Sequence, residues 1–178
     1  VECAAGKYNP QPGQASDTCV ECGAGKYSGS TGQTNNTCCL DCAAGKYNPE
    51  PGQASELSCD DCLAGKYASS PSGADACLRC EAGKHNPSPG QPDATSCIDC
   101  TAGKFANIPE GAFSCEECGL GKFKSVPLQA FDTCAECAAG KYAELQSGAS
   151  ACVDCEAGKY NPEPGQASDT CLECASGK

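Results

Sequence analysis

Large hydrophobic side chains are sparse along the chain, and the rings among them recur at one point of a short repeat. The repeat reads Cys-x-Ala-Gly-Lys-Tyr, then a loop rich in Pro, Ser and Gly, then Cys-x-x-Cys, whose second Cys opens the next repeat. The ring stands two residues after the repeat glycine and is Tyr six times, Phe twice (Phe105 and Phe123) and His once (His85). Such short segments between turn residues predict β pairings of two or three residues, little helix and mostly irregular backbone.

The repeat runs through the whole chain. Its opening cysteines lie 18 to 20 residues apart and define nine complete repeats, numbered 1 to 9, and the start of a tenth: Cys3, Cys22, Cys42, Cys62, Cys80, Cys100, Cys118, Cys137, Cys155 and Cys174. No linker or change of composition interrupts the series, which predicts one continuous array over residues 1–178, with coupling mainly between neighbouring repeats. Because the chain starts and stops inside repeats, we expect it to be a segment of a longer secreted precursor.

The composition excludes a single large hydrophobic core of the kind that ordinary globular domains have. Leu, Ile, Val and Phe together number 18 of 178 residues, and Met and Trp are absent. Twenty cysteines, in contrast, exceed a tenth of the chain, which is typical of disulfide scaffolds from oxidising compartments. We therefore expect a small disulfide-rich fold, an elongated tandem array of repeats of about 19 residues, located outside the cell or on its surface.

The net charge of the chain limits the classes of partner that it is expected to bind. The formal net charge of −11 disfavours nucleic acid and anionic membranes, since both attract basic surfaces. No apolar run is long enough to span a bilayer. Ten of the eleven lysines follow a repeat glycine, and an acidic residue precedes nine of the ten opening cysteines. The periodic lysines and the periodic acidic residues thus form two charge stripes of opposite sign along the array. These stripes either align neighbouring arrays side by side or form weak, solvated ion pairs.

The evenly spaced Cys-x-x-Cys pairs fit two chemistries. They match the spacing of a zinc template, and they match a ladder of disulfides equally well. Zinc modules close in discrete groups of four ligands, whereas this series continues without grouping, so we favour disulfides and expect no metal and no cofactor. Spacing alone leaves the connectivity of the disulfides open.

The repeat resembles a known family. The stretch from Cys22-Gly23-Ala24-Gly25-Lys26-Tyr27 through Cys38-Cys39-Leu40-Asp41-Cys42 looks like the ephrin-receptor-like cysteine-rich repeat and is similar to the first module of tumour necrosis factor receptor cysteine-rich domains. Ala stands where that family commonly has Pro (Ala5, Ala24, Ala44). Long uninterrupted arrays of this kind look most like large surface proteins of algae and other unicellular eukaryotes. The resemblance implies an elongated ectodomain in which each opening cysteine bonds the first cysteine of the closing Cys-x-x-Cys: Cys3–Cys19, Cys22–Cys38, Cys42–Cys59, Cys62–Cys77, Cys80–Cys97, Cys100–Cys115, Cys118–Cys134, Cys137–Cys152 and Cys155–Cys171.

Two cysteines remain outside this pairing. Cys174 most simply bonds a residue beyond the end of the chain. Cys39 follows Cys38 directly, and it is a free thiol, an interchain bridge, or the true partner of Cys22 with Cys38 left free.

Three further features are candidate sites. Asn35-Asn36-Thr37 is the single N-glycosylation sequon, so we expect a glycan on Asn35. The loops of repeats 6 and 7 carry apolar residues where other loops are polar, which predicts either contact with another chain or a small local cluster: Ile108, Phe113, Val126, Leu128 and Phe131. His85 is expected to substitute for a packing ring, since no second histidine accompanies it.

These features together predict an extracellular structural rod, a component of a cell-surface coat, filament or flagellar hair that assembles from many copies by self-association or lateral packing. We expect no enzymatic activity, because no constellation of acid, base and nucleophile is evident. The alternative is a receptor or adhesin ectodomain that binds a protein or glycan ligand, and a zinc-binding array is a minor one.

Overall fold

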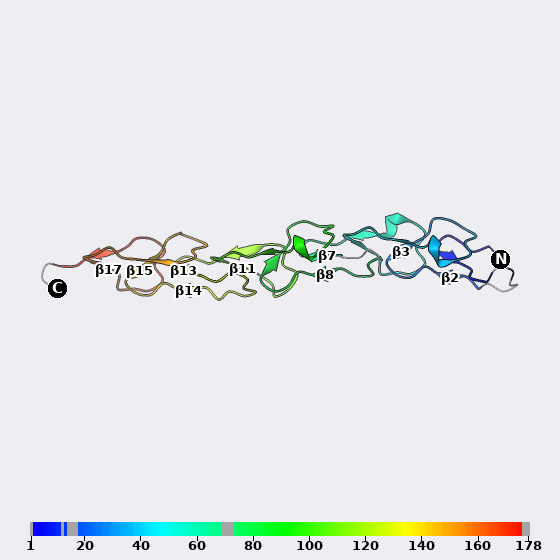
Figure 1. Ribbon diagram of the computed structural model, residues 1–178. Helices are drawn as coiled ribbons and strands as arrows, with labels where there is room; N and C mark the ends of the chain where they lie inside the picture. The colour runs from blue at the N-terminus through cyan, green and yellow to red at the C-terminus, as the bar shows by residue number, and fades with distance from the viewer. Residues whose placement is uncertain (1, 12, 14–17, 69–72, 176–178) are drawn as a thin grey trace. The chain divides into compact units, whose positions relative to one another are not determined.

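The computed structural model describes residues 2–11, 13, 18–68 and 73–175. In this part of the chain each of the nine repeats forms one two-stranded antiparallel hairpin from two successive strands (Figure 1). The pairs are β1 (Lys7–Tyr8) with β2 (Val20–Glu21), β3 (Lys26–Tyr27) with β4 (Leu40–Asp41), β5 (Lys46–Tyr47) with β6 (Asp60–Asp61), β7 (Lys66–Tyr67) with β8 (Leu78–Arg79), β9 (Lys84–His85) with β10 (Ile98–Asp99), β11 (Lys104–Ala106) with β12 (Cys115–Glu117), β13 (Lys122–Phe123) with β14 (Ala135–Glu136), β15 (Lys141–Ala143) with β16 (Cys152–Asp154), and β17 (Lys159–Tyr160) with β18 (Leu172–Glu173).

The hairpin is built by the two fixed motifs of the repeat. In repeat 6, Gly103 has a φ of +80°, which an L-residue adopts only with strain, and the Lys104 amide donates to the Thr101 carbonyl at 3.1 Å to close the turn. The Gly103 carbonyl then accepts a 2.8 Å hydrogen bond from the amide of Cys118, the next opening cysteine. The glycine therefore starts the hairpin, and the following Cys-x-x-Cys ends it.

Three loops contain a short 3₁₀ helix before the closing cysteine: η1 (Asn36–Cys38), η2 (Glu56–Ser58) and η3 (Ala94–Ser96). A polar side chain caps each one by accepting from a backbone amide two residues ahead, from Thr37 to Asn35, from Leu57 to Ser55 and from Thr95 to Asp93. The described residues contain no α-helix, as the loop composition predicts.

The chain divides into two compact parts, residues 1–79 with 87–96 and residues 80–86 with 97–178. Within the first part, repeats 1 and 2 are joined by backbone hydrogen bonds of 2.8 Å: Gly6 donates to Ser28, Asn9 to Gln33, and Gly32 to Cys3. Tyr8 thereby forms an isolated parallel bridge with Gln33. Neighbouring repeats are therefore joined by main-chain groups.

The second part repeats this joint. Between repeats 6 and 7, the Gly103 amide donates to the Lys124 carbonyl at 2.8 Å and the Leu128 amide to the Cys100 carbonyl at 3.0 Å. Ala106 donates to Gln129 at 3.0 Å in the position of the Asn9–Gln33 bond. The joint is thus preserved although the loops of repeats 2 and 7 differ in sequence.

Within each compact part, several repeats also approach the second repeat after them. A Cβ placed on Gly103 in repeat 6 would lie 2.0 Å from the Gly148 carbonyl oxygen in repeat 8. In the first part, a Cβ on Gly6 would lie 2.1 Å from the Gly52 carbonyl oxygen, again two repeats ahead. Real Cβ atoms do not come this close to backbone, so glycine is required for this contact as well as for the turn.

Cysteine and small residues form the core. The opening cysteines of repeats 1 to 8 are buried, and alanines pack with them in the second part, where Ala106 and Ala112 surround Cys100 and Ala143 and Ala149 surround Cys137. The buried surface consists mainly of sulfur and methyl groups, so the disulfides take the place of a larger apolar core.

Candidate functional site

The cysteines form nine disulfides within the described residues, with Cα–Cα distances of 5.5 to 5.8 Å that are usual for this bond. Eight of these join the predicted partners: Cys3–Cys19, Cys42–Cys59, Cys62–Cys77, Cys80–Cys97, Cys100–Cys115, Cys118–Cys134, Cys137–Cys152 and Cys155–Cys171. Such a density of disulfides is typical of proteins that mature in an oxidising environment.

Repeat 2 differs from the predicted pairing. Cys22 bonds Cys39, so the expected Cys22–Cys38 bond is wrong. The two free thiols are Cys38 and Cys174, and Cys39 is not one of them. The reason is register: Cys39-Leu40-Asp41-Cys42 preserves the Cys-x-x-Cys spacing, with β4 as its two middle residues, whereas Cys38 ends η1. The Cys-x-x-Cys spacing of the other repeats was the signal that could have identified Cys39 as the partner of Cys22.

The ring-bearing residues take part in the joint between neighbouring repeats. Tyr27 and Phe123 form parallel bridges with the next repeat at Gln53 and Ala149, as Tyr8 does with Gln33. Phe123 also packs against the core cluster of Cys137 in repeat 8. The Phe123 ring thus packs on the core of the neighbouring repeat, whereas the bridges of Tyr8 and Tyr27 are formed by main-chain groups.

His85 occupies the same place in repeat 5. Its Nδ1 lies 3.1 Å from the Ile98 carbonyl oxygen across the hairpin and 3.1 Å from Cys115 Sγ in repeat 6. His85, Cys100 and Cys115 form a cluster of residue types that can bind a metal. Both sulfurs of this cluster belong to the Cys100–Cys115 disulfide, however, and are not thiolates. In this bonded state the histidine contacts the disulfide of the neighbouring repeat.

The two charge stripes meet within the hairpins. In eight repeats the strand register places the repeat lysine opposite the acidic residue that precedes the next opening cysteine. Six of these lysines form an ion pair with that residue, such as Lys84–Asp99 at 2.5 Å and Lys7–Glu21 at 3.2 Å, and Lys159 pairs with Glu156 instead. The hydrogen bond to Asp99 raises the pKa of Lys84. Repeat 4 is different, because its register places Lys66 opposite Arg79. The partly exposed pairs neutralise charge locally and contribute little stability each.

The sequon residue Asn35 is exposed and caps η1. Its side-chain oxygen accepts from the amide and the hydroxyl of Thr37, so the two polar residues of the sequon contact each other. The site is accessible on the surface of repeat 2.

The apolar loop residues of repeats 6 and 7 are exposed. Phe113 and Phe131 have 53% and 61% of their surface accessible, and Ile108, Val126 and Leu128 are exposed as well. These side chains are therefore accessible to another chain. Leu128 is the one non-glycine residue with positive φ (+62°) among the described residues, and it stands where other loops have glycine.

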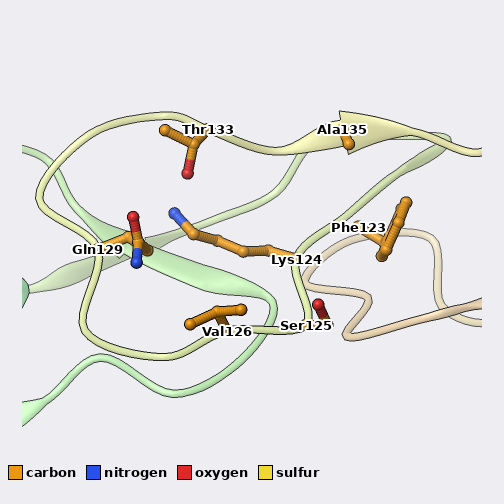
Figure 2. A pocket seen from close by; sticks show the side chains of 7 residues that line it. All are labelled: Phe123, Lys124, Ser125, Val126, Gln129, Thr133 and Ala135. Atoms are coloured by element: carbon orange, nitrogen blue, oxygen red, sulfur yellow. The ribbon is translucent and has the colours of Figure 1, made fainter.

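A small hollow lies inside the loop of repeat 7 (Figure 2). It has a volume of about 250 Å³, and its lining residues are Phe123, Lys124, Ser125, Val126, Gln129, Thr133 and Ala135. The Lys124 side chain extends across the loop between Gln129 and Thr133, as Figure 2 shows. Lys124 is the lysine outside the repeat pattern, and sequence reasoning did not identify it as a special position.

Lys124 braces its loop from within. Only 5% of its surface is exposed, its Nζ donates to the Phe131 carbonyl at 3.2 Å, and the same atom lies 5.5 Å from the Phe105 ring centroid. Burial lowers the pKa of Lys124. Repeats 1 and 3 have Asn9 and Asn48 at this position, and their side-chain oxygens accept from the backbone two residues ahead. The lysine thus takes over the bracing role of the asparagine.

No protein-family model matches the chain, and no curated protein matches it. The chain is a tandem array of repeats of about 19 residues, each with a disulfide and a short β hairpin. None of the helices in the described residues is long and apolar enough to cross a membrane.

Proposed function

We propose that this chain is an extracellular structural protein, a component of a cell-surface coat, filament or flagellar hair that assembles from many copies, and that it is not an enzyme. The observation that carries the proposal is the joint between repeats. It consists of backbone hydrogen bonds of 2.7 to 3.0 Å that recur from repeat to repeat, with one disulfide in each repeat. Such a construction suits a load-bearing role, since every repeat is covalently closed and held to its neighbours.

We further propose that the repeats are of the ephrin-receptor-like kind, similar to the first module of tumour necrosis factor receptor domains. The bond from the opening cysteine to the closing Cys-x-x-Cys, which that resemblance implies, supports this view. A secreted location and a glycan on Asn35 belong to the same proposal, and both are favoured by the disulfide density and by the exposure of Asn35.

A second copy of the chain is the proposed partner. Aliphatic residues opposite the ring in the hairpin are 43% to 54% exposed and recur at the spacing of the repeat: Val20, Leu40, Leu78, Ile98 and Leu172. A copy of the same chain presents the same spacing, so repeated weak contacts add up along two arrays.

The test is the association of the purified, oxidised chain. Sedimentation velocity over a wide concentration range is expected to show growing oligomers, and negative-stain electron microscopy is expected to show filaments or sheets. The double variant Phe113→Ser/Phe131→Ser should weaken this association, because both rings are exposed in loops predicted to contact another chain. Leu57→Ser is the matched control, since Leu57 is 92% exposed in a repeat with polar loops. A chain that stays monomeric at every concentration would refute self-assembly.

A further inference from the structure

Repeat 2 contains three sulfur atoms in one place. Cys22 and Cys39 form the disulfide, and the Cys38 Sγ lies 3.9 Å from the Cys39 Sγ. All three sulfurs lie within 4.8 Å of one another. Cys22 is 1% exposed, whereas Cys38 and Cys39 are partly exposed. A free thiol therefore contacts a disulfide whose other sulfur is also within reach.

The turn that carries Cys38 has a serine in other repeats. Ser58 in η2 and Ser96 in η3 stand at the same point before the closing cysteine, and their hydroxyls donate to the carbonyls of the capping residues Ser55 and Asp93. The capped turn thus needs a small polar residue at this position and does not need a thiol. Cysteine at this point adds chemistry that the fold does not require.

Loop length permits either bond. The Cys22–Cys39 disulfide spans a sequence separation of 17, and the disulfides of the other repeats span 15 to 17. A Cys22–Cys38 bond would be one residue shorter and remain within this range. The chain entropy of closing the two loops is nearly equal, since it varies only with the logarithm of loop length.

We propose that repeat 2 is a thiol–disulfide exchange site with two disulfide isomers. The Cys38 thiolate attacks the Cys22 Sγ, the Cys22–Cys38 bond forms, the Cys22–Cys39 bond breaks, and Cys39 leaves as the thiolate. The proton given up by Cys38 is recovered by Cys39, and no oxidant or reductant is consumed. One thiol therefore becomes available for modification at either of two adjacent positions.

The isomers can be trapped in the oxidised chain with N-ethylmaleimide. Labelling at pH 8 for times from minutes to hours, followed by acid quenching and peptide mapping, is expected to give adducts on both Cys38 and Cys39, with the Cys39 fraction increasing over the time course. The rate of appearance of the Cys39 adduct should be independent of protein concentration and should decrease about tenfold per pH unit on the acid side of the thiol titration, because only the thiolate attacks. An adduct on Cys38 alone at all times, with Cys22–Cys39 fully retained, would overturn the proposal, and so would a rate proportional to protein concentration.

Three variants distinguish disulfide exchange within repeat 2 from other origins of the N-ethylmaleimide adducts. Cys38→Ser should retain Cys22–Cys39 and take no label in repeat 2, since serine fits the turn. Cys39→Ser should form Cys22–Cys38, and failure to form this bond during oxidative folding would show that the second isomer is not accessible. Cys174→Ser removes the other free thiol. Loss of the Cys39 adduct in that variant would assign the exchange to Cys174 and refute the intramolecular route.

Discussion

The contact between a repeat and the second repeat after it is tested by two glycine substitutions that differ in one respect. Gly103 and Gly140 have nearly the same φ, +80° and +81°, and donate equivalent hydrogen bonds to the next repeat, to Lys124 at 2.8 Å and to Asn161 at 2.7 Å. A Cβ on Gly103 would meet the Gly148 carbonyl oxygen at 2.0 Å, whereas a Cβ on Gly140 would meet nothing within 4 Å. The pair Gly103→Ala and Gly140→Ala therefore isolates the close approach.

The expected magnitudes follow from these contacts. Alanine in the left-handed region costs about 1–2 kcal/mol, and reduced freedom of the unfolded chain offsets about 0.4–1 kcal/mol of this. Gly140→Ala should thus destabilise by about 1 kcal/mol. Gly103→Ala must in addition displace the Gly148 backbone, which adds about 1–3 kcal/mol of overpacking and weakens the 2.9 Å bond from the Gly148 amide to Cys118. The difference between the two variants should be about 2–4 kcal/mol.

Guanidinium unfolding of the oxidised chain, followed by tyrosine fluorescence, measures the total change. Hydrogen exchange at the Gly148 amide measures the local one, and it should be faster in Gly103→Ala and unchanged in Gly140→Ala. If both variants lose the same stability within about 0.5 kcal/mol, repeats two apart are not in energetic contact, and this account of the fold is wrong.

Two further outcomes concern single side chains. Lys124→Ala should destabilise the chain by about 2–3 kcal/mol because it removes a buried charged donor and its packing. Lys122→Ala, the control on partly exposed β13, should change the free energy of unfolding by less than about 0.5 kcal/mol. Equal guanidinium midpoints for the two variants would contradict the bracing role of Lys124. The hydrogen bonds from the Thr95 side chain and amide lower the pKa of Asp93, so the stability that this cap provides is fully present above the ordinary value of 3.8 and is lost as pH falls through the lowered pKa of the folded state. Hydrogen exchange at the Thr95 amide should report this acid-dependent loss, and Asp93→Asn should abolish it; the same acid dependence in the variant would assign the loss to another group.

The sequence located the repeats because the opening cysteines recur every 18 to 20 residues, and eight of the nine disulfide pairings followed from the family resemblance rather than from spacing. The error in repeat 2 arose where two cysteines are adjacent, and the pairing that preserves Cys-x-x-Cys was the right one. The hairpins were foreseen from turn residues, and their register then placed the two charge stripes opposite each other.

Other features were outside the reach of periodicity. The approach of Gly103 to Gly148 joins residues 45 positions apart, and such a contact depends on how successive repeats are rotated, which no local pattern encodes. Lys124 was overlooked because a lysine in a polar loop is normally solvated. Its burial depends on the path of the loop around it and on the ring of Phe105 in the preceding repeat.

The joint between repeats, made by the main chain, also bears on how the array grew. Because the donors and acceptors are peptide groups, the end of one repeat fits the start of any other, and loop sequence need not be matched across the junction. A gene segment of this kind can gain or lose whole repeats by unequal recombination without creating an incompatible boundary. Repeats 1 and 9 agree closely in sequence over Ala5–Cys22 and Ala157–Cys174, as recent copying of a single repeat would leave them. Array length is then free to vary between alleles while each loop diverges on its own.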